Sequence, residues 1–412
     1  MSGEFLFLAH RIPFPPDRGD KIRSHHVLKA LARLAPIHVG TFADDEIDLD
    51  PEAELAIVAA SYHIAHRAKP LALAGLQALA SRRPVSLPAF ADASLHRYVA
   101  RTLAERPIAA IYAFSSQMAQ YVPDDFAGRV VMDFVDVNSA KFEAYAARAA
   151  QPARALYARE ARLLAAWEAK VARRASMSLF VTREEAALFR TRIDGATRAR
   201  ARVRSLGNGI DCAHYDPAQV RPAAALGDAE SPHLVFTGQM DYAPNVAAAE
   251  RFARRVMPTI RATLPSARFH IVGRRPAPRV AALDGHEGTQ VWGAVEDVRP
   301  WLAAADVVVV PLEIARGVQN KLLEALAMAR PVIASPESAT GIAARDGVEL
   351  AIAEDDAVFA ARALALIAAP EEREAMGAAA RRFALDHLSW PAMLADLPGI
   401  VEIAPGRARR AA

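Results

Sequence analysis

The sequence has 412 residues, a formal net charge of +3 and 53% hydrophobic residues. This length exceeds one compact core, so it predicts two domains of roughly 200 residues each. Cys212 is the only cysteine, which excludes a disulfide framework and a cysteine-built metal site. Every apolar run is far shorter than the ~20 residues of a membrane span, and the amino terminus lacks the basic start of a signal peptide. We therefore expect a soluble, cytoplasmic protein.

Short β-like runs alternate with longer helical patterns along the chain. Nine such runs stand out, and they occupy residues 5–9, 37–42, 108–114, 130–135, 178–182, 233–238, 268–273, 307–311 and 331–335. Continuous apolar strands separated by helices indicate parallel sheets that are covered on both faces. A polar stretch, residues 216–232, interrupts the pattern. The fold class predicted is α/β, with two doubly wound domains and a ligand site beyond the carboxyl ends of the strands.

The net charge is unevenly spread, because residues 148–204 hold 14 Arg and Lys against 5 Asp and Glu. Such a stretch is either a solvated helix face or a contact surface for an anionic membrane or nucleic acid. No aromatic stacking pattern accompanies the charge, so we expect no nucleic-acid partner. The solvated face and the membrane surface stay as alternatives.

Two segments of the first half place polar residues directly after predicted strands. In residues 10–31, Gly19 precedes a predicted helix, and Lys21 and Arg23 add positive charge, a pattern typical of either an anion-binding loop or an ordinary strand-to-helix connection. In residues 130–146, Asp136 could act as a general base or hydrogen-bond a sugar hydroxyl. Equally, Asp136 or Asn138 could cap the next helix.

The segment of residues 311–335 is the most informative. A buried strand ends at its start, a glycine-bearing loop follows, and a helix is expected to begin near Asn320. Gly317 allows the backbone to approach a ligand closely, and Lys321 at a helix amino terminus suits a diphosphate. Glu324, one turn later, can accept both hydroxyls of a ribose. The alternative is a surface ion pair between Lys321 and Glu324 worth a few tenths of a kcal/mol.

These segments resemble a known family. RGVQNKLLEALAMARPVIAS, ending at Ser335, is similar to the donor-binding motif of glycosyltransferase family four, which has the GT-B fold. Together with HRIPFPPDRGDKIRSHHVLKAL and VDVNSAKFEAYA, it resembles the sugar transferases of bacterial exopolysaccharide and exosortase (PEP-CTERM) loci. SLGNGID, VFTGQMDYAPNVAA, FHIVG and HLSWPAM resemble further motifs of the family, in the same order.

The resemblance implies two Rossmann-like domains that face each other across a cleft. The expected ranges are residues 1–215 for the acceptor side, 216–385 for the nucleotide-sugar side, and 386–412 for a closing helix that returns to the first domain, with a tail. It further implies retaining transfer from a nucleotide diphosphate-sugar as co-substrate, with no cofactor or metal held by the protein. The acceptor would be a glycan or lipid-linked molecule, reached from the cytoplasm at the inner face of the membrane.

The resemblance also assigns roles to residues. Lys321 and Asp136 are the expected catalytic residues, with Asp136 on the acceptor side. The donor would be bound by Glu324, Gly317, Arg316, Val318, Gln319, Asn320 and Gly238. The loop that closes over donor and acceptor would contain Gly19, Asp20, Lys21 and Arg23.

The chain departs from the family pattern at three places. Arg316 stands where the family often has a glutamate that contacts the donor sugar, which leaves the sugar unidentified. Gln239 and Met240 stand where a basic pair is common, so neutralisation of the diphosphate would depend on Lys321, together with Arg274 or Arg316. Asn138 and Phe142 stand where the narrower group usually has Asp and Trp. Two rival interpretations follow: a nucleotide-sugar epimerase or hydrolase on the same fold, or a non-catalytic nucleotide-sugar-binding scaffold.

Overall fold

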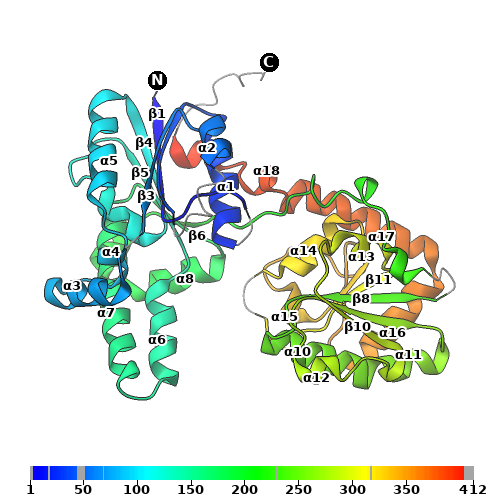
Figure 1. Cartoon of the computed structure of the whole chain (residues 1–412). Helices are drawn as coiled ribbons and strands as arrows, with labels where there is room; N and C mark the ends of the chain where they lie inside the picture. The colour runs from blue at the N-terminus through cyan, green and yellow to red at the C-terminus, as the bar shows by residue number, and fades with distance from the viewer. Residues whose placement is uncertain are drawn as a thin grey trace. The chain divides into compact units, whose positions relative to one another are not determined.

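The computed structural model describes residues 3–16, 19–43, 52–67, 69–227, 231–315 and 318–402. Contacts divide the chain into two units (Figure 1). The first domain comprises Met1–Asn208 and Leu394–Ala412, and the second comprises Gly209–Met393. The sequence places the domain boundaries at 215/216 and 385/386, whereas the contacts place them at 208/209 and 393/394.

The first domain is built on a parallel sheet with strand order β3-β2-β1-β4-β5-β6-β7 among the described residues. Its strands are β1 (Glu4–Ala9), β2 (Ile37–Ala43), β3 (Ser61–His66), β4 (Ile108–Phe114), β5 (Arg129–Val135), β6 (Met177–Phe180) and β7 (Val203–Ser205). The sequence order reverses between β1 and β4, which is the topological switch point of a doubly wound sheet.

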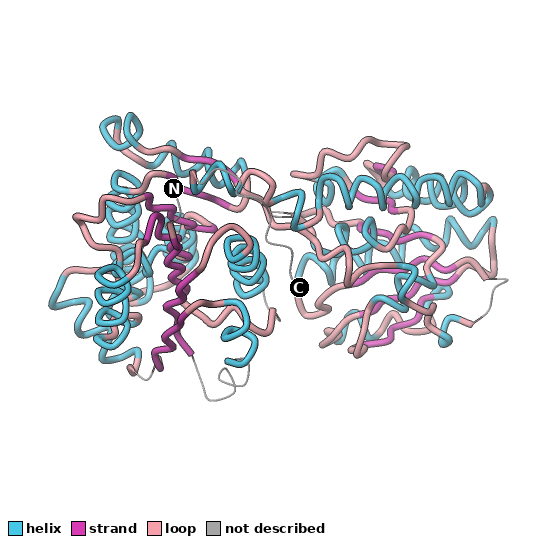
Figure 2. The backbone as a smooth tube through the Cα atoms, turned by 90° about the horizontal axis from the view of Figure 1, so that it is seen from above, coloured by secondary structure: helices cyan, strands magenta, loops and turns pink. Residues whose placement is uncertain are grey.

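Helices connect these strands and cover both faces of the sheet (Figure 2). They are α1 (Gly19–Ala32), α2 (Glu52–Val58), α3 (Leu71–Ser81), α4 (Ser86–Ala89), α5 (Ala93–Glu105), α6 (Asn138–Arg148), α7 (Ala153–Arg174), α8 (Arg183–Arg192), α9 (Gly195–Arg200) and the carboxy-terminal α19 (Leu397–Val401). Leu397 and Ile400 of α19 are buried, and the Ile400 carbonyl accepts a hydrogen bond from Arg129 at the start of β5. The end of the described chain is therefore part of the first domain.

The second domain repeats the same plan, with strand order β10-β9-β8-β11-β12-β13. Its strands are β8 (His233–Thr237), β9 (Arg268–Val272), β10 (Thr289–Gly293), β11 (Val307–Val310), β12 (Val332–Ala334) and β13 (Ala351–Ile352). Its helices are α10 (Ala243–Arg251), which a π-helical turn joins to α11 (Met257–Thr263), then α12 (Pro278–Ala281), α13 (Arg299–Ala304), α14 (Asn320–Ala327), α15 (Pro336–Ala339), α16 (Asp356–Ala368), α17 (Pro370–Phe383) and α18 (Trp390–Met393). The switch point here lies between β8 and β11.

The central strands form the cores. All four valines of β11 are fully buried, as are the apolar residues of β1 and β8. A strand covered by helices on both faces has no solvent-facing side, so it is a continuous apolar run in the sequence. This is why all nine predicted strands are present in the structure.

Four strands were not predicted, and they are the edge strands of the two sheets: β3, β7, β10 and β13. β3 contains two histidines and is mostly half-buried, and β7 and β13 have only three and two residues. An edge strand needs neither length nor a continuous apolar run, so it leaves a weak signal. Among the described helices, none combines the length and apolar character needed to cross a membrane.

Candidate active site in the second domain

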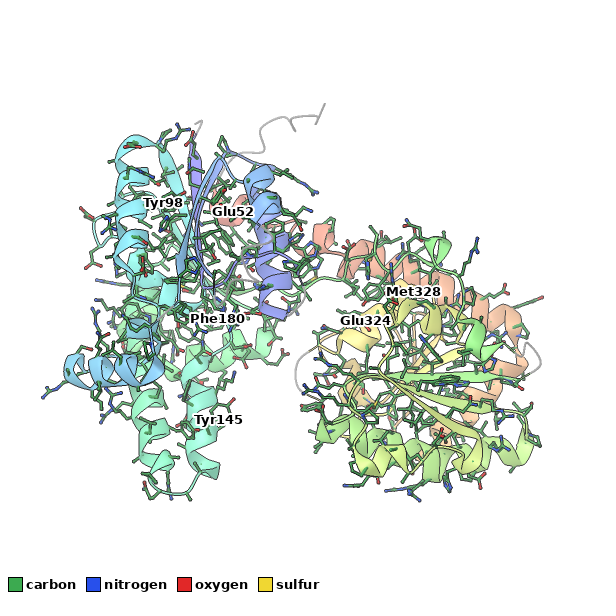
Figure 3. The ribbon with its side chains drawn as sticks, viewed as in Figure 1. Glu52, Tyr98, Tyr145, Phe180, Glu324 and Met328 are labelled. Atoms are coloured by element: carbon green, nitrogen blue, oxygen red, sulfur yellow. The ribbon has the colours of Figure 1, made fainter. Side chains whose placement is uncertain are left out.

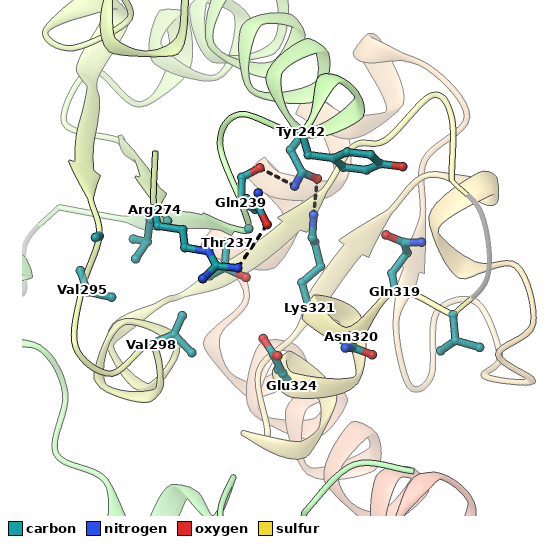
Figure 4. A pocket seen from close by; sticks show the side chains of 16 residues that line it. Thr237, Gln239, Tyr242, Arg274, Val295, Val298, Gln319, Asn320, Lys321 and Glu324 are labelled. Atoms are coloured by element: carbon teal, nitrogen blue, oxygen red, sulfur yellow. Dashed lines mark hydrogen bonds between the residues drawn. The ribbon is translucent and has the colours of Figure 1, made fainter. Parts of the chain in front are cut away.

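A pocket of about 530 Å³ lies at the carboxyl edge of the second sheet, at its switch point (Figure 4). Three neighbouring strands, β8, β9 and β10, end in it, and the first turn of α14 forms one wall. Its lining consists of Thr237, Gly238, Gln239, Tyr242, Asn245, Val272, Gly273, Arg274, Ala294, Val295, Val298, Val318, Gln319, Asn320, Lys321 and Glu324. This is where doubly wound sheets bind ligands.

The floor of the pocket is formed by glycines at the strand ends. Gly238 follows β8 and Gly273 follows β9, and a Cβ atom built on Gly273 would lie 1.6 Å from the Gly238 carbonyl oxygen. The Gly273 amide donates to the Gly293 carbonyl at the end of β10, at 2.8 Å. A Cβ on Gly238 would in turn lie 3.0 Å from Nζ of Lys321. Only glycine allows the strand ends and Lys321 to come this close together.

Lys321 projects from the first turn of α14 into the pocket. Its Nζ donates a hydrogen bond to Oδ1 of Asn245 and lies 4.8 Å from the ring centroid of Phe236. Burial lowers the pKa of Lys321 to about 8, and the nearby carboxylate of Glu324 offsets only part of this effect. The ammonium is therefore held in a site that is short of negative charge, as expected of a group that meets an anionic ligand.

Glu324 lies one helical turn after Lys321 and lines the same pocket (Figures 3 and 4). Burial raises the pKa of its carboxyl group, against the hydrogen bond from the hydroxyl of Tyr215 and the charge of Lys321. Burial, and then the Glu324 carboxylate, raise the pKa of the half-buried Tyr215, so this hydroxyl stays protonated and donates to the carboxylate. Tyr215 thus holds one side of Glu324 in place, and the other side faces the pocket.

Two further side chains belong to the pocket wall: Arg274, which is predicted from the sequence as a possible phosphate partner, and Asn245, which is not. Asn245, buried in the first turns of α10, donates through Nδ2 to the Gln239 carbonyl at 2.9 Å while accepting from Lys321. Nη2 of Arg274, just after β9, donates to Oε1 of Gln239 at 3.3 Å. Both follow strand ends, and that position was the available signal. Which of them meets Lys321 depends on packing between segments 76 residues apart.

The remaining predicted donor residues lie at the start of α14. Val318, Gln319 and Asn320 all line the pocket. The N-cap residue of the helix is Gln319, and its side chain makes no capping hydrogen bond. The helix amino terminus therefore presents backbone N–H groups toward the pocket, as at anion-binding helix ends. Arg316 and Gly317 lie outside the described residues.

The predicted closing-loop residues lie at the start of α1 in the first domain. Gly19 is the first residue of α1, and a Cβ there would meet nothing within 4 Å. Asp20 accepts a hydrogen bond from Arg11 at 2.6 Å and contacts His10 at 3.2 Å, and these two partners lower its pKa. Lys21 is buried, at 2% exposure. The side chains of Asp20 and Lys21 are thus held within the first domain.

The side chain of Arg23 is buried in a hydrogen-bond network within the first domain. It is 1% exposed, and its Nε and Nη2 donate to the two carboxylate oxygens of the fully buried Asp133 at 2.9 and 3.2 Å. Nη1 donates to the Leu206 carbonyl at 2.8 Å and to Oδ1 of Asn208 at 3.0 Å. Tyr112 donates to the same Asp133 carboxylate at 2.7 Å. This buried network connects α1 to β5 and to the segment after β7 that contains Leu206 and Asn208.

Asp136 lies just after β5, on a strained turn. Its amide donates to the Phe134 carbonyl at 2.9 Å, and Val135 between them has φ of 68°, a rare conformation for a β-branched residue. Such strain often accompanies functional positions. Burial raises the pKa of Asp136, although the charge of Lys141 lowers it.

Neither Asp136 nor Asn138 caps helix α6, so the capping alternative is wrong. The N-cap residue is Val137, whose amide donates to Glu185 at 2.7 Å. The amide and hydroxyl of Ser139 donate to Glu168 at 3.0 and 2.7 Å. Carboxylates from other helices therefore satisfy this helix end.

In the described part of the chain, no three His, Cys, Asp or Glu side chains gather closely enough to hold a metal ion.

Two doubly wound parallel-sheet domains, one with a polar pocket at its switch point, define the GT-B class of fold, and known structures confirm it. HepE of Anabaena, solved in complex with UDP, matches at a TM-score of 0.63 and 15% identity, over 97% of this chain and 99% of that one. Sucrose-phosphate synthase of Thermosynechococcus elongatus matches at 0.63 and 16%, over 97% and 98%. WaaG, a glycosyltransferase of lipopolysaccharide biosynthesis, matches at 0.55 and 17%, over 96% and 99%.

The second domain is assigned more closely. Residues 231–369 match the model of the family described as glycosyl transferases group 1. The matched range contains the pocket-lining residues from Thr237 to Glu324. No curated protein sequence matches the chain.

Proposed function

We propose that this chain is a glycosyltransferase that takes a sugar from a nucleotide diphosphate-sugar bound in the pocket of the second domain. The observation that carries the proposal is the pairing of Lys321 and Glu324 on the first turn of α14, at the switch point of a domain that matches the glycosyl transferases group 1 family. The structure of HepE with UDP, which has the same fold, supports a nucleotide as the ligand.

The pocket offers distinct surroundings for each part of such a donor. Val295 and Val298 give an apolar wall suited to a nucleobase. Glu324, fixed by Tyr215, would accept the two hydroxyls of the ribose. The diphosphate would meet Lys321, the amino terminus of α14 and the backbone at Gly238, which are close together.

Catalysis would depend chiefly on the charge of Lys321. A bound diphosphate would add negative charge beside Lys321, so it would raise the lowered pKa of Lys321 and keep the ammonium protonated. As the bond to the sugar breaks, negative charge grows on the departing diphosphate. The ammonium and the helix amides are already oriented toward that charge, which stabilises the transition state. Arg274 lines the pocket and provides a second positive charge.

The finer features of the reaction are proposed on the resemblance described above. We propose retaining transfer of a hexosyl group, without a protein-bound metal or cofactor, to a glycan or lipid-linked acceptor in exopolysaccharide biosynthesis at the cytoplasmic face of the membrane. Asp136 is the proposed residue of the acceptor side, and its strained turn and raised pKa support a role beyond structure. The anomeric configuration of the product, read by NMR, tests the retaining assignment.

The direct test measures thermal stabilisation of the full chain by a panel of nucleotides and nucleotide-sugars. A ligand that binds the native state at 100 times its Kd should add about 2.7 kcal/mol of stability. Lys321→Ala and Glu324→Ala should lose most of this effect and of sugar transfer, whereas Lys29→Ala, on the exposed last turn of α1, should keep both. Tyr215→Phe, which frees one side of Glu324, should weaken binding about tenfold.

The rival interpretations give different results in the same assays. Rapid hydrolysis or epimerisation of the donor without acceptor would favour the epimerase or hydrolase. Tight donor binding without turnover across a broad acceptor panel would favour the scaffold. No stabilisation by any member of the panel, or wild-type turnover by both the Lys321 and Glu324 variants, would refute the site.

A further inference from the structure

Helix α3 of the first domain exposes large apolar side chains and buries small ones, which is the reverse of an ordinary surface helix. Its fully buried side is lined by Ala74 and Ala78, whereas Leu73, Leu76 and Leu79 are 46%, 66% and 57% exposed. At about 100° per residue, the three leucines span an arc of about 120° directly opposite the two alanines. We call these three leucines the leucine face. Large apolar side chains that point away from the core mark an interaction surface.

The surroundings of the leucine face are positively charged. Residues 67–91 contain Arg67, Lys69, Arg82 and Arg83 but no Asp or Glu. Arg82 and Arg83 directly follow α3 and are exposed. An apolar face bounded by arginines at its end resembles helices that lie in a membrane interface, where leucines enter the acyl region and arginines meet headgroups.

Helix α7 packs beside α3 and extends this charge (Figure 1). Nη2 of Arg159 donates to the Ala78 carbonyl at 2.7 Å, and the Val85 amide donates to Glu160 at 2.8 Å. The two acidic residues of α7, Glu160 and Glu168, are both buried. Every charged side chain that α7 exposes is therefore basic, and Arg162 is among the exposed ones.

The position of the leucine face follows from the direction of the strands in the first sheet. Helix α3 follows β3, and α6 follows β5, so both leave the carboxyl edge of the sheet, where Asp136 also lies. Tyr145 of α6, which Figure 3 labels, is 44% exposed. It packs against Tyr157 of α7, with ring centroids 5.8 Å apart. The basic and apolar surface thus lies at the edge of the domain that is proposed to receive the acceptor.

We propose that the leucine face of α3, with Arg82 and Arg83, docks this protein on an anionic lipid bilayer. The inference deepens the proposed function, on which it rests for a lipid-linked acceptor, by naming the element that contacts the membrane. Charge complementarity selects the anionic surface, since the exposed charges beside the leucines are basic. A two-fold contact between copies would bring the same positive clusters together, and nucleic acid would leave the leucines without a partner.

The test is co-sedimentation of the full chain with vesicles of phosphatidylcholine alone or with about 30% phosphatidylglycerol. Binding should require the anionic lipid and should weaken at least tenfold between about 0.1 and 0.5 M salt. Leu73→Gln/Leu76→Gln/Leu79→Gln should weaken it at least tenfold as well. The matched control Ile57→Gln/Leu188→Gln/Leu385→Gln, which removes three exposed apolar side chains elsewhere, should bind like the wild type.

A second pair of variants tests the charge. Arg82→Gln/Arg83→Gln should reduce binding to the anionic vesicles, whereas Arg97→Gln/Arg101→Gln, an exposed pair on α5, should not. Equal binding by the wild type and the leucine variant, or by neutral and anionic vesicles, would overturn the proposal. So would the absence of vesicle binding, or a wild-type dimer in sedimentation velocity that the leucine variant lacks.

Stabilisation by nucleotide, measured without vesicles, keeps this proposal separate from the proposed function. The leucine variant should retain the full effect, because the pocket lies in the second domain. If the wild type bound vesicles but no nucleotide, the proposed function would fail and the membrane surface would stand. If it bound nucleotide but not vesicles, the reverse would hold.

Discussion

The most informative single change is Lys321→Met, because it should stabilise the protein while removing its proposed function. Burial lowers the pKa of Lys321 from 10.5 to about 8. At about 1.4 kcal/mol per pKa unit, the charged lysine costs the folded state about 3 kcal/mol at neutral pH. Methionine removes that cost and packs on the Phe236 ring, but it leaves Oδ1 of Asn245 without its donor, at about 1 kcal/mol. The net expectation is a gain of about 2 kcal/mol.

The sign of the pH dependence makes the test specific to this lysine. Because the folded-state pKa is lowered, the unfolded chain binds more protons between about pH 8 and 10.5, and the wild type gains stability as the pH rises through that window. The advantage of the variant should therefore be complete below about pH 8 and disappear by about pH 10.5. Other titrating groups contribute equally to both proteins and cancel in the difference.

Urea unfolding of the full chain measures the difference in unfolding free energy between the variant and the wild type at pH 7 and pH 10. Hydrogen exchange in peptides of β8 and α14 is the probe of unfolding. Lys29→Met, an exposed lysine in the last turn of α1, should change stability by less than about 0.5 kcal/mol at either pH. The Lys321 variant should also lose its stabilisation by nucleotide. Destabilisation at pH 7, or a gain that does not change with pH, would refute the account of Lys321 as a cation that lacks a counter-ion.

Three further predictions concern the supporting structure. Gly273→Ala should open the pocket floor and abolish nucleotide stabilisation, because its Cβ would lie 1.6 Å from the Gly238 carbonyl; unchanged nucleotide binding would contradict this. Arg23→Gln should cost about 3 to 5 kcal/mol of unfolding free energy, since it leaves the buried Asp133 without its partner, and a loss below 1 kcal/mol would be inconsistent with the network. Burial raises the pKa of Glu168 to about 7. The wild type should therefore lose up to about 3 kcal/mol of unfolding free energy relative to Glu168→Gln as the pH rises from 4.5 to above 7. Parallel pH profiles of the two proteins in urea unfolding would refute this.

How much of the fold the sequence predicts follows from burial. Every strand interior to a sheet was predicted, because two covered faces demand an apolar run such as the four valines of β11. The edge strands were missed because one neighbour and one solvated side relax that demand. Within the described ranges, β3 (Ser61–His66) pairs with only β2, and it consists largely of polar and half-buried residues. Its place in the sheet is decided by pairing with distant residues, which local patterns do not encode.

The site was predictable where it lies within one helix and its preceding strand. The spacing of Lys321 and Glu324 could be read directly, and both line the pocket. Their partners could not be predicted, because Asn245 contacts Lys321 from helix α10 and Tyr215 contacts Glu324 from the segment before β8. Their contacts depend on how the strands of the second sheet are ordered, and a single sequence without that order gives no reason to pair them.

Two of the basic residues that were predicted to meet ligand show what the sequence cannot separate and the structure can. Both Arg23 and Lys321 follow a strand and lie near a helix amino terminus. Burial alone would lower the pKa of Arg23, yet the carboxylate of Asp133 more than reverses this, and the protein stabilises its charged form. For Lys321, burial outweighs the nearby carboxylate of Glu324, and the pKa is lowered. Its ammonium has three donors but makes one hydrogen bond among the described residues. A cation that the fold itself neutralises contributes to the fold. A cation that the described residues leave with spare donors and an unfavourable charge, at the switch point of a sheet, is one for which we propose an anionic ligand.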